Sequence, residues 1–190
     1  FSTESAGDHS VPPPGCKLSQ MVTVSGTMNV SGVAGASPLH ELAAVGGTPD
    51  EGNPKRHFKV TANAELRLSY LKLTGGRVVT TGDGKGGTIL VEGAASRLKV
   101  VSALFAGCTR DEAHPAICAG YGGAIYARNG AQVEVTASVF ERCNAQLNGG
   151  VIHARDSGTI VSFASTHFIS NTAVDWYGGV MHIAYSAIGY

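Results

Sequence analysis

Short blocks of alternating apolar and polar residues recur along the chain, and four of them open with a Gly-Gly pair. The four blocks are GGTILVE (86–92), GGAIYAR (122–128), GGVIHAR (149–155) and GGVMHIA (178–184). Because successive side chains of a strand point to opposite faces, we expect the fourth and sixth residues, which are apolar in every copy, to face a common interior. The fourth residues are Ile89, Ile125, Ile152 and Met181, and the sixth are Val91, Ala127, Ala154 and Ile183.

A second repeated block follows the first three Gly-Gly strands, and one copy precedes them all. Its copies are LRLSYLKL (66–73), LKVVSALF (98–105), VEVTASVF (133–140) and VSFASTHF (161–168). The second residue is polar in each copy and is expected to face water: Arg67, Lys99, Glu134 and Ser162. The eighth residue is large and apolar and is expected to stack in one interior ladder: Leu73, Phe105, Phe140 and Phe168.

The spacing of these blocks predicts the architecture. Their starts at 66, 98, 133 and 161 are separated by 32, 35 and 28 residues. A coil of this length with two or three short strands cannot bury its apolar side alone, but coils stacked in parallel share one core. The sequence therefore predicts an all-β fold, a right-handed parallel β-helix (solenoid) with an irregular N-terminal coil. A β-sandwich also has alternating strands, but it does not explain columns that keep one consensus.

The regions outside the clear repeats are assigned less directly. We expect an extended N-terminal tail or linker at 1–20, because of Pro12-Pro13-Pro14, and the β-helix at 21–190, with its clear repeats at 56–190. Ser37-Pro38 either caps a short helix to about Val45 or precedes another coil strand. The segment 48–56 is predicted to be a surface loop, and the longest loop is placed around Cys108 to Tyr121.

Several of these motifs resemble a known family. RHFKV (56–60), AELRLSYLKLTGG (64–76), the Gly-Gly strands and the Phe-x-x-Asn turn at 168–171 are similar to the polymorphic outer-membrane protein repeat. That repeat belongs to the pectate-lyase-like right-handed β-helix superfamily. The turns at Phe105 and Phe140 depart from the pattern, because Cys stands where the family prefers Asn. The resemblance covers about 56–190.

The resemblance implies a secreted or cell-surface protein, since carriers of this repeat are typically adhesins or wall-associated proteins. The alternative location is the lumen of an organelle, as part of a complex. The implied function is a non-catalytic module that is structural, adhesive or glycan-contacting, or a subunit of a larger assembly. Because other members of the superfamily are polysaccharide lyases and hydrolases, the alternative is a polysaccharide-active enzyme. Fold-level likeness alone does not decide between them.

Charge and hydropathy narrow the range of partners. Lys plus Arg and Asp plus Glu number 14 each, so no net field favours nucleic acid or an acidic membrane surface. No apolar run approaches the roughly 18 residues of a membrane-spanning helix. The chain starts at Phe1 without Met or a signal peptide, which we interpret as a mature product or a fragment.

The outward column of the Gly-Gly strands contains the candidate binding residues. If coils stack about 4.8 Å apart, His153 and His182 lie next to each other. The candidate ligand-binding residues are Tyr126, Arg128, His153, Arg155 and His182. Guanidinium and imidazole donors suit a carboxylate, a sulfate or a sugar acid, and two imidazoles suit a transition metal if a third ligand is found. The simplest alternative is a polar, solvated sheet face.

No catalytic residues and no cofactor are assigned. Lyases of this superfamily use clustered carboxylates that hold calcium, and the related hydrolases use clustered aspartates. The aspartates here share no strand column and form no close pair: Asp8, Asp50, Asp83, Asp111, Asp156 and Asp175. The chain also has no GxSxG, HExxH, P-loop or CxxC motif.

The cysteines and one sequon give candidate modification sites. Cys108 and Cys143 follow the ladder residue by three positions in neighbouring coils, so stacking predicts a disulfide between them. Cys118 is a rival partner, Cys16 is the fourth cysteine, and unpaired thiols are the alternative. Asn29 lies in a glycosylation sequon.

The C-terminal end predicts a protein partner. GGVMHIA opens a new coil at 178–184, and no polar helix or charged loop follows it. Met181 and Ile183 would then cover the core on one side only. We expect further coils, a second copy or a partner subunit at this end, with a glycan as a further candidate partner.

Overall fold

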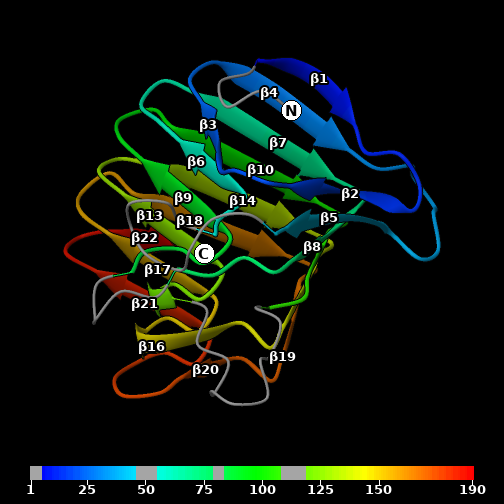
Figure 1. Cartoon of the computed structure of the whole chain (residues 1–190). Coiled ribbons are helices and arrows are strands. Elements are labelled where there is room, and N and C mark those ends of the chain that lie inside the picture. Colours follow the sequence, from blue (N-terminus) through cyan, green and yellow to red (C-terminus); the bar gives the residue numbers. More distant parts are fainter. Residues whose placement is uncertain (1–5, 46–54, 79–83, 108–118) are drawn as a thin grey trace.

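The strands of the chain form stacked parallel coils (Figure 1). A computed structural model describes residues 6–45, 55–78, 84–107 and 119–190. Every pairing between named strands in these ranges is parallel, and no residue there is helical. The predicted all-β parallel β-helix is therefore confirmed. Since it has no helix, the described part of the chain has none that could span a membrane.

Four sheets run along the stack, and each coil contributes one strand to most of them. Sheet A consists of β3 (Val22–Val24), β6 (Phe58–Val60), β9 (Ile89–Glu92), β13 (Ile125–Arg128), β17 (Ile152–Arg155) and β21 (Met181–Ala184). Sheet B consists of β1 (Gly7–Ser10), β4 (Thr27–Ser31), β7 (Glu65–Ser69), β10 (Arg97–Val101), β14 (Gln132–Thr136), β18 (Ile160–Ala164) and β22 (Ile188–Gly189). Sheet C consists of β2 (Gly15–Leu18), β5 (His40–Ala44), β8 (Leu71–Thr74), β11 (Leu104–Phe105), β15 (Val139–Glu141) and β19 (His167–Ile169). Sheet D, which among the described residues is found in the C-terminal half, consists of β12 (Ala119–Tyr121), β16 (Asn144–Asn148) and β20 (Thr172–Ala173).

The predicted columns stack in register. On sheet A, Ile125 pairs with Ile89 on one side and with Ile152 on the other, and all three are buried. On sheet C, Phe140 pairs with Phe105 and Phe168, and the ring centroids are 4.4 Å and 5.7 Å apart. Phe140 is fully buried, so the eighth column forms the expected interior ladder.

The Gly-Gly pairs are required by the corners that lead into sheet A. Gly122 has a φ of 61°, and a Cβ there would lie 2.0 Å from the carbonyl oxygen of Ile125. A Cβ on Gly123 would lie 2.2 Å from the carbonyl oxygen of Gly150 in the next coil. Neither position leaves room for a side chain, so the pair allows adjacent coils to approach closely.

Asn171 explains the Asn of the Phe-x-x-Asn turn. Its Oδ1 accepts a hydrogen bond from the backbone N–H of Cys143 at 2.9 Å, and its Nδ2 donates one to the carbonyl oxygen of Phe140 at 3.0 Å. The side chain therefore satisfies two backbone groups of the preceding coil at a corner.

The N-terminal segment differs from the prediction. Residues 1–20 were expected to form an extended tail, but β1 pairs with β4 and β2 pairs with β5. Val11 and Leu18 are buried and belong to the hydrophobic core. The β-helix therefore begins before residue 21, and the first strands are part of it.

Two other segments are settled by the structure. Of the two alternatives after Ser37-Pro38, the coil strand is found, as β5. The predicted surface loop at 48–56 lies mostly outside the described residues, but Arg56 at its end is buried. Its Nε donates a 2.8 Å hydrogen bond to the carbonyl oxygen of Gly86, which allows the guanidinium to lie inside the protein. The longest loop was predicted around Cys108 to Tyr121. Residues 108–118 lie outside the described residues, and Ala119–Tyr121 form the strand β12 instead of a loop.

Candidate functional site

Three of the candidate binding residues form a stack of rings on the outer face of sheet A. His153 pairs with Tyr126 and with His182 in the two neighbouring coils. The centroids of the Tyr126 and His153 rings are 5.2 Å apart and the ring planes differ by 9°. The centroids of the two histidine rings are 4.8 Å apart, as predicted from the spacing of coils.

This ring stack is largely buried. Tyr126 is 1% exposed and His153 is 4% exposed, so the interpretation of a solvated sheet face is wrong for these residues. Tyr121 of β12 packs edge-on against His153, with the centroids 5.1 Å apart. Tyr177 stacks on His182 at 6.4 Å. Side chains that precede the Gly-Gly corners therefore fold over the outer face of sheet A.

The ring stack forms the floor of a pocket with a volume of about 250 Å³, which we call the aromatic pocket. Three of its aromatic side chains stay open to solvent: Trp176 is 61%, Tyr177 69% and Tyr185 71% exposed. The described residues that line the pocket are Tyr121, Tyr126, Asn148, His153, Arg155, Trp176, Tyr177, His182, Ala184 and Tyr185.

The cations near this pocket already have partners. Nε of Arg155 lies 3.0 Å from Oδ1 of Asp156, and its guanidinium carbon lies 4.8 Å from the centroid of the Tyr185 ring. The hydrogen bond to Asp156 raises the pKa of Arg155. Arg155 thus contributes a flat, neutralised surface more than an open positive charge.

Arg128 is not among the described residues that line the aromatic pocket, although the sequence grouped it with them. Its Nη2 lies 2.7 Å from Glu92 Oε2, and Lys59 Nζ lies 2.8 Å from Glu92 Oε1. Burial alone would raise the pKa of Glu92, but the hydrogen bonds to Lys59 and Arg128 lower it. Arg128 therefore belongs to an ion-pair network across three coils.

Burial disfavours the charged form of both histidines in the ring stack. It is the main cause that lowers the pKa of His153 to about 4, and the nearby His182 and Arg155 also contribute to this lowering. Burial also lowers the pKa of His182. Nδ1 of His153 and Nδ1 of His182 are buried and have no hydrogen-bond partner among the described residues. Such unpaired buried groups are costly, so each calls for an explanation.

The described residues do not provide the third ligand that the metal alternative needs. No group of three or more His, Cys, Asp or Glu side chains within these ranges could hold a metal ion. The described lining of the aromatic pocket also includes no Asp or Glu. What the described lining of the aromatic pocket offers to a ligand is polar side chains and the faces of aromatic rings.

Sequence reasoning missed about half of this pocket. Trp176 and Tyr177 precede the last Gly-Gly pair, and Tyr121 precedes an earlier one. The available signal was position, because Tyr177 and Tyr121 immediately precede a Gly-Gly pair and the only Trp of the chain adjoins Tyr177. Asn148 precedes the third pair in the same way, and its Oδ1 accepts a 3.0 Å hydrogen bond from the backbone N–H of Tyr177.

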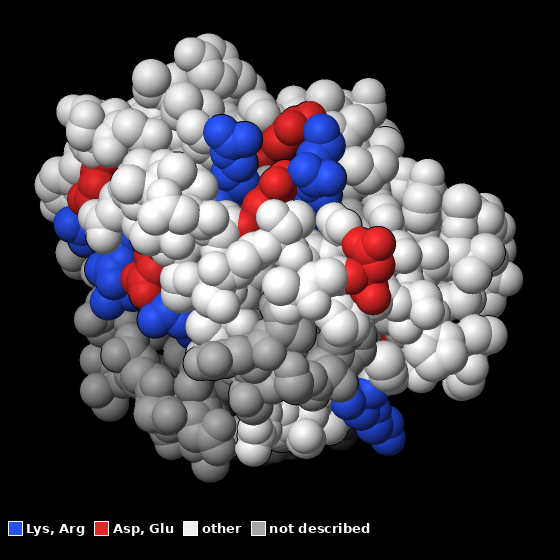
Figure 2. All heavy atoms as spheres, turned by 90° about the horizontal axis from the view of Figure 1, so that it is seen from above, with Lys and Arg blue, Asp and Glu red and all other residues white. Residues whose placement is uncertain are grey.

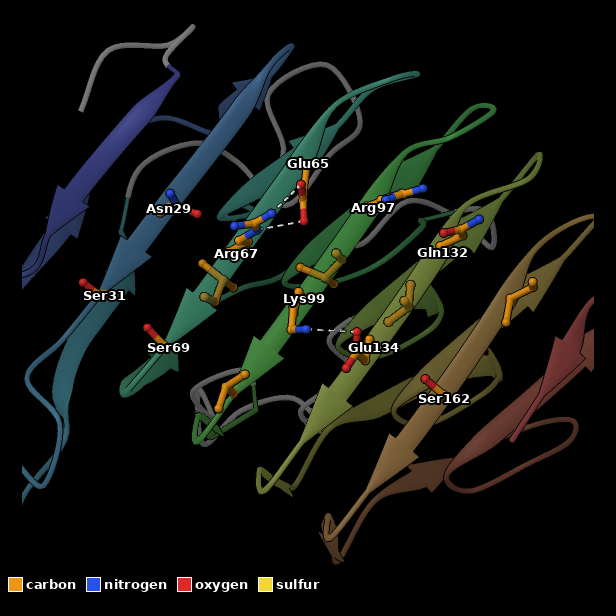
Figure 3. A pocket seen from close by; sticks show the side chains of 15 residues that line it. Asn29, Ser31, Glu65, Arg67, Ser69, Arg97, Lys99, Gln132, Glu134 and Ser162 are labelled. Atoms are coloured by element: carbon orange, nitrogen blue, oxygen red, sulfur yellow. Dashed lines mark hydrogen bonds and ion pairs between the residues drawn. The ribbon is translucent and has the colours of Figure 1, made fainter.

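A second surface lies on the outer face of sheet B and forms a groove of about 850 Å³, which we call the charged groove (Figure 3). It crosses β4, β7, β10, β14 and β18, and its polar side chains point away from the core. The polar residues that line it are Asn29, Ser31, Glu65, Arg67, Ser69, Arg97, Lys99, Gln132, Glu134 and Ser162. The water-facing second column predicted from the sequence lies here.

Opposite charges alternate in the charged groove. Arg67 Nε and Nη2 donate to the two carboxylate oxygens of Glu65 at 2.8 Å and 3.0 Å. Lys99 Nζ lies 3.3 Å from Glu134 Oε2 in the next coil. Blue and red side chains also lie side by side on the face seen from above the N-terminal coils (Figure 2). The mixture agrees with the balanced composition.

The candidate modification sites have different surroundings. Cys143 is a buried free thiol, and burial raises its pKa to about 12. Cys16 is also a free thiol, as the alternative of unpaired thiols expects for these two residues, whereas Cys108 and Cys118 lie outside the described residues. Asn29 of the sequon lies in β4, and its Nδ2 donates to Asp8 Oδ1 at 2.5 Å. Nδ2 is the atom that would carry a glycan.

The chain was compared with known proteins in three ways. No family model matches it, no curated protein is significantly similar to it, and no solved structure matches it. The resemblance to the outer-membrane protein repeat therefore remains a prediction from the motifs.

Proposed function

We propose that the chain is a non-catalytic β-helix module that binds a glycan in the aromatic pocket. The observation that carries the proposal is the combination of three exposed aromatic side chains, Trp176, Tyr177 and Tyr185, with polar side chains that line the same pocket. The proposal keeps the secreted or cell-surface location expected from the sequence.

The physical argument rests on the two kinds of surface that a sugar ring presents. The C–H groups of a pyranose face are weakly positive and pack against the electron-rich face of an aromatic ring. The hydroxyl groups at its edge need hydrogen-bond partners, which Asn148, His153 and the tyrosine hydroxyls can offer. A volume of about 250 Å³ is close to the lower end of small-ligand pockets, which suits one or two sugar units.

Binding without catalysis is supported by the composition of the pocket. Glycoside hydrolysis commonly needs a pair of carboxyl groups that flank the scissile bond. The described residues that line the pocket supply aromatic rings, imidazoles, one amide and one guanidinium, but no carboxylate. We therefore favour a binding module over the alternative, a polysaccharide-active enzyme.

The test is binding of the 190-residue chain to a panel of immobilised oligosaccharides. Trp176→Ala and Tyr177→Ala should each weaken binding by roughly tenfold or more, because each removes a stacking surface. The matched control is Tyr190→Ala, since Tyr190 is 75% exposed and is not among the described residues that line the pocket. Absence of binding to every glycan, or equal losses for Tyr190→Ala, would contradict the proposal. Product release from the same oligosaccharides would favour the enzyme alternative.

We also propose that the C-terminal coil docks against the N-terminal coil of a second copy. Each sheet has an unpaired strand at this end, namely β21, β22, β19 and β20, and β3, β1 and β2 are the first strands of sheets A, B and C. Most of the exposed large apolar side chains in the described ranges also lie here: Ile169, Val174, Trp176, Tyr177, Tyr185, Ile188 and Tyr190. Open edges and apolar surface together favour strand addition.

Light scattering over a range of concentrations tests this docking. We expect association that Ile169→Glu weakens, because it places a charge on β19 at the edge of sheet C. The control is Ala94→Glu, at an exposed site in the turn between β9 and β10, in the middle of the stack and away from both ends. A monodisperse monomer at high concentration would contradict self-association.

A further inference from the structure

We infer that Tyr185 is a ligand-stacking ring of the aromatic pocket, kept there in a strained backbone conformation and oriented by Arg155. This inference rests on the proposed glycan-binding function and gives two residues of the pocket different roles. Tyr185 contacts a sugar face directly, and Arg155 acts through Tyr185 as a positioning residue. The chain loses some stability at one corner and gains a binding contact there.

The corner that follows sheet A has a left-handed backbone in each of the last four coils. The residue directly after β9, β13, β17 and β21 has a positive φ in every case: Gly93 (102°), Asn129 (57°), Asp156 (73°) and Tyr185 (54°). Gly, Asn and Asp adopt this region most readily, whereas a bulky side chain there is an outlier. Three coils therefore have a residue that suits the corner, and the fourth has a tyrosine.

The next position sharpens the contrast between two of these corners. Asn129 is followed by Gly130, which has a φ of 82°, and Asn-Gly is a pair that two successive positive φ values favour. Tyr185 is followed by Ser186, which has a φ of 65°. The C-terminal corner is therefore formed by two residues that suit its backbone poorly.

The surroundings of Tyr185 do not offset the cost of its backbone conformation. Its side chain is 71% exposed, so it buries little apolar area. The ring contacts the guanidinium of Arg155, but a cation–π contact at an exposed site contributes no more than a left-handed tyrosine costs. Tyr70, the other tyrosine with a positive φ in the described ranges, is half-buried and gains from packing. Uncompensated strain of this kind points to a functional role.

Arg155 fixes the orientation of the Tyr185 ring. Its guanidinium carbon lies 4.8 Å from the centroid of this ring, and its Nε lies 3.0 Å from Oδ1 of Asp156. The ion pair with Asp156 thus holds the guanidinium against one face of the ring. Both Arg155 and Tyr185 line the aromatic pocket, and the exposure of Tyr185 leaves the opposite ring face available to the C–H groups of a sugar. A ring that is already oriented loses less entropy on binding than a mobile one.

The experiment measures stability and binding in the same variants of the full chain. The probes are neutral hexasaccharides of glucose, xylose and mannose, together with any member of the immobilised panel that binds. Tyr185→Asn introduces the residue type of the equivalent corner, so it should raise the melting temperature by about 2–4 °C. It should also weaken binding about tenfold in isothermal titration, because the stacking ring is lost. Tyr185→Phe keeps the ring and should change neither quantity by a comparable amount.

The matched control is the reciprocal exchange, Asn129→Tyr. Asn129 is exposed, occupies the equivalent corner and is not among the described residues that line the aromatic pocket. The control should lower the melting temperature by about 2–4 °C and leave the sugar affinity unchanged.

The role of Arg155 is tested by a double-mutant cycle. Arg155→Met removes the guanidinium and keeps an unbranched side chain. It should weaken binding several-fold in the unmodified chain and have no further effect in the Tyr185→Asn background, because it acts through the ring. Additive losses would mean that Arg155 contacts the ligand itself, and they would overturn its positioning role.

The outcomes separate this inference from the proposed function. If Tyr185→Asn binds sugars with full affinity, or melts no higher than the unmodified chain, the inference is overturned and glycan binding is left intact. Light scattering of the same variant identifies a role in docking between copies. Loss of self-association with unchanged sugar affinity would assign the ring to that contact and would also overturn the inference. If no oligosaccharide binds, both proposals fail.

Discussion

Sheets A and B belong to the same coils and alternate in the same way, yet their outer faces differ. On sheet A the outward residues Tyr126 and His153 are buried under neighbouring side chains. On sheet B the outward residues Arg67, Lys99 and Glu134 line an open groove and pair with one another or with neighbours (Figure 3). The difference comes from side chains that precede the Gly-Gly corners, such as Tyr121 of sheet D, which turn back over sheet A. The alternation of apolar and polar residues predicts which face of a strand points outward. The side chains at the Gly-Gly corners then determine whether that outer face is exposed to solvent.

The largest expected effect concerns the interior that both sheets share. Phe140→Ala removes a fully buried ring from the middle of the ladder between Phe105 and Phe168. The loss of burial and the resulting cavity should cost about 3–5 kcal/mol of unfolding free energy. Denaturant titration measures it. An unchanged midpoint would mean that this column does not form the core.

Tyr126→Ala tests whether the outer face of sheet A behaves as an interior. Tyr126 is 1% exposed and is packed between Tyr121 and His153, so we expect the substitution to lower the unfolding free energy by about 3 kcal/mol. The same substitution at a solvated outward position would cost a small fraction of this. A loss below about 0.5 kcal/mol would show that the face is open, as on sheet B.

The pH dependence of stability sharpens the comparison. His153 has a pKa of about 4 in the folded protein and 6.5 without burial, so between these values the unfolded chain binds more protons. The contribution of the neutral His153 to the unfolding free energy is complete above pH 6.5 and is lost as the pH falls towards 4. This loss of unfolding free energy should reach about 2–3 kcal/mol. His153→Phe should remove this part of the pH dependence. His57, which burial also brings to a pKa of about 4, should retain its own part in that variant.

The smallest effect is expected on sheet B. Lys99→Ala breaks the ion pair with Glu134, whose partners are 46% and 55% exposed. Exposed pairs of this kind contribute at most about 1 kcal/mol and weaken with salt. A loss comparable to that of Tyr126→Ala would remove the distinction between the two faces.

The repeats predicted the fold because they carry its strongest constraint. Columns such as Ile89, Ile125 and Ile152 must be apolar to fill a shared interior, so burial is recorded directly in the sequence. The first coils were harder to predict from the sequence, since β1 and β2 follow no repeat consensus and adjoin three prolines. Their places depend on pairing with β4 and β5, which lie about 20 or more residues away.

The candidate site was predicted only in part, for a similar reason. Register placed Tyr126, His153 and His182 in one stack, because all three occupy the same repeat position. Trp176 and Tyr185 lie outside the repeat consensus, so their approach to this stack could not be derived from it. The partner of Arg128 was also missed, although Glu92 occupies the same repeat position, whereas Asp156 could be placed beside Arg155 because it follows it in the chain.

The aromatic pocket spans the last two strands of sheet A, because His153 lies on β17 and His182 on β21. In a stack whose coils contact only their neighbours, the terminal coil opens most readily. A ligand held by both strands must dissociate before β21 can separate, so ligand occupancy should slow amide hydrogen exchange in β21 and leave β9 unchanged. Ligand binding would then stabilise the C-terminal coil of the β-helix against local unfolding.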